Sequence, residues 1–199
     1  MIMGHFASAL VPRALRVPVP LSLLFVASNL PDFIWFALAA LGAEPTTPTS
    51  FLDVSLQGLH ADMQYSHSAA VDVAIAVVFG AIVFAVTRSR SAGLWCGGLV
   101  VGHLVCDWLS GFEHGLVLHG SPMVGFNLYA SAPGAALAIE VVFAALCVAV
   151  SLRLREAPHL VSTRQKLALY GAFVGGILMF APTASLTARE LAARFGVEF

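Results

Sequence analysis

Histidine and aspartate are spaced for metal binding in the segment Gly102-His103-Leu104-Val105-Cys106-Asp107. A separation of four residues places His103 and Asp107 one turn apart on the same face of a helix. An imidazole nitrogen beside a carboxylate oxygen suits zinc or iron. The alternative is a structural pair, in which the histidine hydrogen-bonds to the carboxylate and only ties helices together. The spacing therefore predicts either a metal site or a helix-tying pair.

Two more polar positions lie where apolar sequence starts or breaks. His67 lies in Tyr65-Ser66-His67-Ser68, directly before an apolar run, and the Ser66 hydroxyl is placed to cap the helix that follows. Asp32 follows Leu30-Pro31, and this proline breaks the apolar run around it. Asp32 is then a metal ligand, a cap of the second half of the broken helix, or both.

His5 and Glu140 complete the set of candidate residues. A short N-terminal helix that runs inward and turns near residues 13–20 would return His5 to the depth of Asp32, because the two arms are of similar length. Without that geometry His5 is only a terminal histidine. Glu140 lies about a third of the way along an apolar run. It is a candidate metal ligand, partner of a ligand histidine, or general base.

Ionisable side chains within apolar sequence are costly, and they mark functional sites in membrane proteins. A buried cluster of histidines and carboxylates needs a cation, because unpaired buried charges are strongly destabilising. The predicted metal ligands are His5, Asp32, His67, His103 and Asp107, and the predicted catalytic carboxylates are Asp32 and Glu140. Asp72 is interpreted as a helix-packing group or as a partner of a metal ligand.

Long apolar runs must position these side chains. Only 11% of the 199 residues are charged, against about 25% in an average soluble domain, and the mean hydropathy is +0.88. A bilayer core needs about 20 apolar residues per helix. The runs that qualify are 19–41, 69–87, 93–109, 134–152 and 167–186. The sequence predicts an all-α polytopic membrane bundle of about five transmembrane helices, preceded by a short N-terminal helix, re-entrant in one arrangement, in a single domain spanning residues 1–199.

Basic residues gather in the connections on one side of this bundle. Arg88 and Arg90 join the second and third runs, and four more basic residues join the fourth and fifth. The positive-inside rule places these connections and the N-terminal turn in the cytoplasm. The loops 44–66 and 110–133, together with the candidate site, then face outward.

Composition also excludes several classes of protein. The net charge of −1 gives no indication of a nucleic-acid partner. The three cysteines show no paired spacing, which predicts neither a disulfide framework nor a cysteine zinc site. The run 19–41 carries prolines and polar residues and is long for a signal core, so it is expected to be a retained part of the structure.

Several short motifs, in this order, resemble those of one bacterial family. The motifs Gly4-His5-Phe6, Leu30-Pro31-Asp32, Ser66-His67-Ser68 and the His103 to Asp107 segment are similar to those of the membrane-bound predicted metal-dependent hydrolases, the YdjM-like group. One branch of that group is also similar in its Gly-Ser-Pro stretch, here Gly120-Ser121-Pro122, before a helix with a glutamate. The resemblance covers the chain up to about Arg155.

That family is in turn distantly similar to zinc-dependent phospholipase C and P1 nuclease, which are helical enzymes that hydrolyse phosphoesters at a zinc cluster. The resemblance implies that His67, His103 and Asp107 are the principal ligands, with Asp107 bridging two metals. It also implies that Asp32 binds metal or acts as a base and that His5 is an N-terminal ligand.

The chain departs from the soluble enzymes at a later helix, where they carry further histidine and glutamate ligands. Glu113, His114 and Glu140 are the stand-ins for those ligands here. One or two metal ions are therefore expected instead of three. His60, His114 and His119 stay open as either ligands or solvated loop residues.

The leading hypothesis is a membrane-embedded metal-dependent hydrolase that acts on a lipid-borne or other phosphoester at the outer face of the bacterial plasma membrane. Zinc is the expected metal, with iron or manganese as alternatives. The expected partners are membrane lipid and a lipid or small-molecule substrate, and no nucleic acid. Two other classes stay open. They are a proton- or cation-coupled transporter, whose polar residues would line a path across the membrane, and a structural membrane protein with a helix-tying metal.

Overall fold

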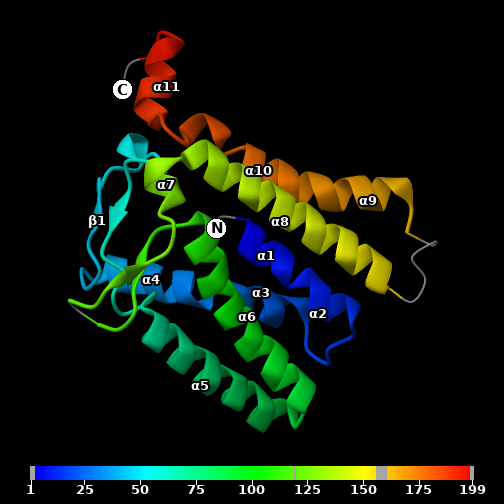
Figure 1. The fold of residues 1–199 in the computed structure, drawn as a ribbon. Coiled ribbons are helices and arrows are strands. Elements are labelled where there is room, and N and C mark those ends of the chain that lie inside the picture. The colour runs from blue at the N-terminus through cyan, green and yellow to red at the C-terminus, as the bar shows by residue number, and fades with distance from the viewer. Residues whose placement is uncertain (1–2, 119, 156–160, 198–199) are drawn as a thin grey trace.

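The computed structural model describes residues 3–118, 120–155 and 161–197 (Figure 1). The fold is mostly helical, with 66% helix and 4% strand. Among the described residues, four helical segments are long and apolar enough to cross a membrane, and a fifth is added if one bent helix pair counts as a span. The predicted helical class is confirmed at this level, and the apolar runs of the sequence coincide with these segments.

The long segments are connected by a turn at residues 88–89 and by long loops at the opposite end of the bundle. Three of them are continuous α-helices, and the last contains a π-helical turn. They are α5 (Ala69–Thr87), α6 (Arg90–Ser110), α8 (Pro133–Leu154) and the segment Thr163–Thr183, which comprises α9 (Thr163–Tyr170), η3 (Gly171–Gly175), α10 (Gly176–Leu178) and η4 (Ala181–Thr183).

The N-terminal part of the chain folds back on itself beside α6. Helices α1 (Gly4–Ser8) and α2 (Leu10–Ala14) run to a turn, after which α3 (Leu21–Ser28) returns alongside α1 (Figure 1). The axis then bends by 62° between α3 and α4 (Leu30–Ala40). The predicted break is therefore present, and the predicted short N-terminal helical arm lies against the first apolar run.

Close approach of two helices fixes the position of α6. Arg88 takes a left-handed conformation after α5, with φ of 56°, and the hydroxyl of Ser89 caps the start of α6. A Cβ added at Gly97 would lie 2.8 Å from the Ala76 carbonyl oxygen of α5. The missing side chain therefore allows backbone-to-backbone contact, as is typical of small residues between membrane helices. Helix α6 also packs against α1, α3 and α8, which places it at the centre of the bundle.

Long loops cover the end of the bundle where α5 begins and α6 ends. They contain short antiparallel strand pairs, which hydropathy did not predict because each strand has only two residues. The pairs are β1 (Thr46–Thr47) with β2 (His60–Ala61) and β3 (His114–Gly115) with β4 (Met123–Val124). The loops also carry η1 (Phe51–Asp53) and α7 (Leu128–Ser131). The Ala70 N–H donates to the Leu116 carbonyl, which ties the second loop to the start of α5.

The C-terminal part differs from the sequence prediction at its edges. The last apolar segment begins at Thr163, before the predicted residue 167, because Ser162 and Gln165 form a capping box. A second capping box, Thr187 with Glu190, starts α11 (Ala188–Arg194), which was not predicted.

Candidate metal centre

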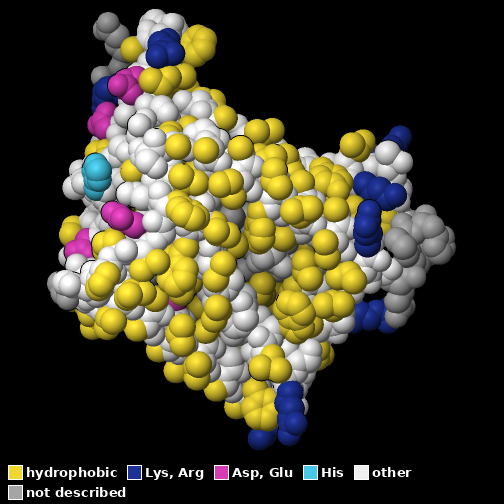
Figure 2. Space-filling model, in the orientation of Figure 1, with side chains coloured by type: hydrophobic (Ala, Val, Ile, Leu, Met, Phe, Trp, Pro, Cys, Tyr) yellow, Lys and Arg dark blue, Asp and Glu magenta, His cyan; other side chains and the backbone are white. Residues whose placement is uncertain are grey.

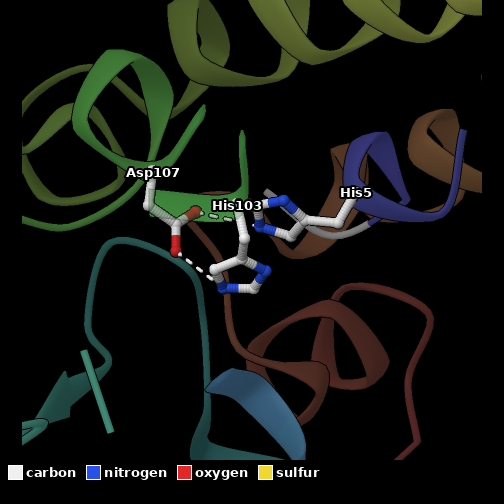
Figure 3. A group of neighbouring side chains, drawn as sticks. All are labelled: His5, His103 and Asp107. Atoms are coloured by element: carbon white, nitrogen blue, oxygen red, sulfur yellow. Dashed lines mark hydrogen bonds and ion pairs between the residues drawn. The ribbon is translucent and has the colours of Figure 1, made fainter. Parts of the chain in front are cut away.

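The structure brings the five predicted metal ligands together at the loop-covered end of the bundle. His103 and Asp107 come from α6, His5 from α1, Asp32 from the first turn of α4, and His67 from the loop before α5. Ligand atoms lie within 4.8 Å of one another in two groups, one of His5, His103 and Asp107 and one of Asp32, His67 and His103. Figure 3 shows the members of the first group, with the Asp107 carboxylate directed at both rings.

Asp107 is the centre of this cluster. Its Oδ1 lies 3.1 Å from His5 Nε2, and its Oδ2 lies 3.3 Å from His103 Nε2. The same Oδ2 lies 3.8 Å from His114 Nε2 and 3.9 Å from His67 Nε2. A carboxylate that faces imidazole nitrogens with both oxygens can offer one oxygen to each of two ions.

The orientation of His103 decides what the cluster can hold. Its Nδ1 lies 2.9 Å from the Ser28 carbonyl oxygen, which can only accept, so Nδ1 carries a proton and Nε2 is the nitrogen that faces the cluster. That Nε2 lies 3.3 Å from His67 Nε2, 3.3 Å from Asp107 Oδ2 and 3.7 Å from Asp32 Oδ1. The carboxylate oxygens bring lone pairs to the same point, and a metal cation is a partner that suits such a set.

The ring of His67 is oriented by its neighbour in sequence. The Ser66 Oγ lies 2.8 Å from His67 Nδ1, and this leaves Nε2 directed at the cluster. Ser66 was expected to cap the following helix. The helix instead starts after Ser68, with no side-chain cap, and the Ser66 hydroxyl is used on the imidazole. Burial lowers the pKa of His67 below its ordinary value, so the ring is neutral and suited to bind metal.

Glu44 holds the same loop in place, and sequence reasoning missed it. Its side chain is fully buried, and Oε1 accepts hydrogen bonds from the Tyr65 N–H at 2.6 Å and the Ser66 N–H at 3.0 Å. The partners are more than 20 residues apart in sequence. No local motif signals such a contact, so only the folded loop identifies Glu44.

Asp32 is the most accessible carboxylate of the cluster. Its side chain is 27% exposed, against 8% for Asp107, and its Oδ1 lies 3.4 Å from His67 Nε2. The helix α4 begins after Asn29, without a side-chain cap. The Asp32 side chain therefore lies in the cluster and does not cap α4.

His114 joins the cluster, although the sequence left it open. It lies in β3, is 3% exposed, and its ring stacks on that of His67 with centroids 5.1 Å apart. His60, in β2, is exposed, and Glu113 is exposed as well. His119 lies outside the described residues. The hairpin of β3 and β4 places His114 Nε2 3.8 Å from Asp107 Oδ2, whereas His60 lies in the other strand pair and is exposed.

A cavity of about 310 Å³ opens onto the cluster. Asp32, His67, Asp107 and His114 line it, and most of the remaining wall is aromatic or aliphatic. The apolar lining residues include Phe6, Phe33, Trp35, Phe36, Met63 and Phe112. The cluster can therefore meet a ligand that has a large apolar part.

Glu140 and Asp72 lie near the cluster without forming part of the two ligand groups. Glu140 is buried in α8 and accepts a hydrogen bond from the hydroxyl of Tyr129, which itself lines the cavity. The general-base role of Glu140 stays a prediction. Asp72 is fully buried in α5, and its carboxylate oxygens have no hydrogen-bond partner among the described residues.

Comparison of the chain with protein-family models, with curated proteins and with solved structures found no match. The geometry of the site is therefore the basis for a functional proposal.

The donor set of the cluster consists of imidazole nitrogens and carboxylate oxygens from five separate parts of the chain. Such mixed nitrogen and oxygen donors suit zinc, iron or manganese. His103 has its second ring nitrogen hydrogen-bonded to a backbone carbonyl, and the second nitrogen of His67 contacts a serine hydroxyl. Second contacts of this type orient metal-binding histidines in known sites. The residues present thus fit a divalent metal ion.

Proposed function

We propose that this chain is an integral membrane protein that holds divalent metal at its outer end and hydrolyses a lipid-borne phosphoester there. The observation that carries the proposal is the orientation of His103, whose Nε2 faces His67 Nε2 and the carboxylates of Asp32 and Asp107. Burying these groups together without a cation would lower the folding stability by several kcal/mol per uncompensated charge.

The charge distribution supports the proposed orientation in the plasma membrane. Most lysine and arginine side chains visible in Figure 2 lie at the right and lower edges of the molecule, and the acidic side chains and a histidine lie at the opposite edge, with further basic side chains beside them at the upper left. Hydrophobic side chains cover most of the surface between them. A cytoplasmic basic end and an outward site agree with the positive-inside rule.

Zinc is the proposed metal, with iron or manganese as alternatives. His5, His103 and Asp107 would hold one ion, and Asp32, His67 and His103 a second position. The resemblance of the histidine and aspartate motifs to the YdjM-like group supports the same assignment. When bound, a divalent ion stabilises negative charge on a phosphoryl oxygen and makes nearby water more acidic.

Asp32 is the proposed proton acceptor, because it is the accessible carboxylate and lines the cavity. In the proposed reaction, the oxygen of water bonds to phosphorus and the bond from phosphorus to the ester oxygen breaks. The proton that Asp32 takes from water passes to the departing oxygen. Asp107, which is more buried, holds the rings of His5 and His103 in position.

The transporter alternative requires polar groups along a path through the bundle. The buried histidine and carboxylate side chains of the described residues instead belong to one end, where α5 begins and α6 ends. This distribution favours a site at one depth. The aromatic wall of the cavity favours a lipid-like substrate over a free polar one.

The test begins with metal content. The protein is purified in mild detergent without chelator, and metals are measured by mass spectrometry in the wild type, in a His103→Ala, Asp107→Ala variant, and in His60→Ala as a control for an exposed histidine. One or two ions per chain are expected in the wild type and control, and none in the double variant.

The metal-loaded protein is then assayed with phosphoester lipids in mixed micelles. Hydrolysis that is lost in the double variant and retained in the control supports the proposal. A sample without transition metal after reconstitution, or a loaded sample that cleaves no phosphoester, would overturn it.

A further inference from the structure

A second cavity of about 140 Å³ adjoins the metal centre. It lies between the segment 61–64 and the hairpin β3–β4, and it shares Met63 and His114 with the aromatic cavity. We call this second cavity the vestibule. His114 lies at the junction, is 3% exposed, and its Nε2 has no hydrogen-bond partner among the described residues. A ligand in the vestibule would therefore reach the cluster at His114.

The vestibule wall presents acceptors more than donors. The carboxylates of Asp62 and Glu113 line it, and no lysine or arginine does so in the described part of the chain. Gln64 Nε2 donates to Asp62 Oδ2 at 3.3 Å, and this leaves Gln64 Oε1 buried without a partner. The hydroxyl of Ser121 already donates to the Val117 carbonyl. The missing partner is a group that donates hydrogen bonds and carries positive charge.

Size limits that group further. The vestibule is small, at about 140 Å³. A short aminoalkyl group fits this volume. The aromatic cavity on the other side of His114 is more than twice as large and is mainly apolar.

We propose that the vestibule binds a small primary-ammonium headgroup, so that the substrate is a lipid phosphodiester with an aminoalkyl head. This inference rests on the proposed function for the position of the phosphate, which lies at the metal centre between the two cavities. The apolar part occupies the aromatic cavity, and the ammonium lies between Asp62 and Glu113. Both carboxylates are exposed, so their contribution is that of screened ion pairs.

The test uses soluble probes and needs no turnover. Dissociation constants of phosphoethanolamine, phosphocholine and glycerol phosphate are measured by equilibrium dialysis with metal-loaded protein in detergent. Phosphoethanolamine is expected to bind roughly two- to thirtyfold more tightly than glycerol phosphate, the range that two exposed ion pairs provide. Phosphocholine carries the charge but no N–H donor, so its affinity is expected to lie between the other two.

Variants separate the vestibule from the general charge of the surface. The double variant Asp62→Asn, Glu113→Gln is expected to bring the three dissociation constants together while metal content stays at the wild-type value. Glu190→Gln is the control, because it removes an exposed acid outside the vestibule and keeps the capping box of α11.

Equal binding of the probes by the wild type, or a preference that survives the double variant, overturns the headgroup assignment. A headgroup preference in protein that holds no metal counts against the hydrolase and supports the vestibule as a binding site. Metal-dependent hydrolysis without a headgroup preference supports the hydrolase and overturns the vestibule assignment. The two proposals therefore fail separately.

Discussion

Replacing Ser66 by alanine tests whether the cluster is a metal site by changing a residue outside the ligand set. The Ser66 hydroxyl lies 2.8 Å from His67 Nδ1, in a fully buried position, and orients the ring. Loss of such an outer contact typically lowers metal affinity 10- to 100-fold. That range corresponds to about 1.4–2.8 kcal/mol of binding free energy. The Ser66→Ala variant should therefore hold the same number of ions as the wild type, but with a dissociation constant raised by this factor.

The assay is a competition with a chelator of known affinity, followed by metal analysis of the protein fraction. Ser151→Ala is the matched control, since Ser151 is equally buried but its hydroxyl donates to the Val148 carbonyl within α8. A change in affinity of less than threefold in Ser66→Ala, or an equal loss in Ser151→Ala, would refute the view that Ser66 orients a metal ligand. A structural hydrogen bond alone would lower stability by about 1–3 kcal/mol and leave the affinity of a correctly folded fraction unchanged.

Three other outcomes follow from the fold and its charges. Chelation of a metal present at 100 times its dissociation constant should remove about 2.7 kcal/mol of stability, so the midpoint of thermal unfolding should fall; an unchanged midpoint would argue against a folded-state metal site. Gly97→Ala places a Cβ 2.8 Å from the Ala76 carbonyl oxygen and should destabilise the fold by about 1–3 kcal/mol. A Cβ at Gly98 has no such atom within 4 Å, so Gly98→Ala should be neutral or stabilising in the same unfolding assay. The hydrogen bond from Arg189 lowers the pKa of Asp53, so the contact that holds α11 to Asp53 should be complete above the ordinary carboxyl pKa and should weaken as the pH falls through the lowered value. Hydrogen-exchange protection of α11 should show this loss, and Arg189→Ala should abolish its pH dependence.

Sequence by itself determined the helices and most of the candidate site. Runs of about 20 apolar residues leave few folds open, because backbone groups in an apolar environment must be paired within the segment. The spacing of His103 and Asp107 places them on one helix face for the same local reason. Proline at position 31 predicted the bend before Asp32, which the structure shows as 62°. These features depend on contacts within a few residues, and local sequence encodes them directly.

Tertiary structure decided how the parts meet. Glu44 and His114 are loop residues without a local motif, and their roles depend on loops that return over the end of α6. The proton on His103 Nδ1 is assigned by the Ser28 carbonyl, which belongs to a helix 75 residues earlier in the chain. The predicted cap at Ser66 was wrong because the Ser66 hydroxyl instead contacts the buried imidazole of His67. The contacts made by the Ser28 carbonyl and by Glu44 join partners distant in sequence, and only the packed structure brings such partners within hydrogen-bond distance.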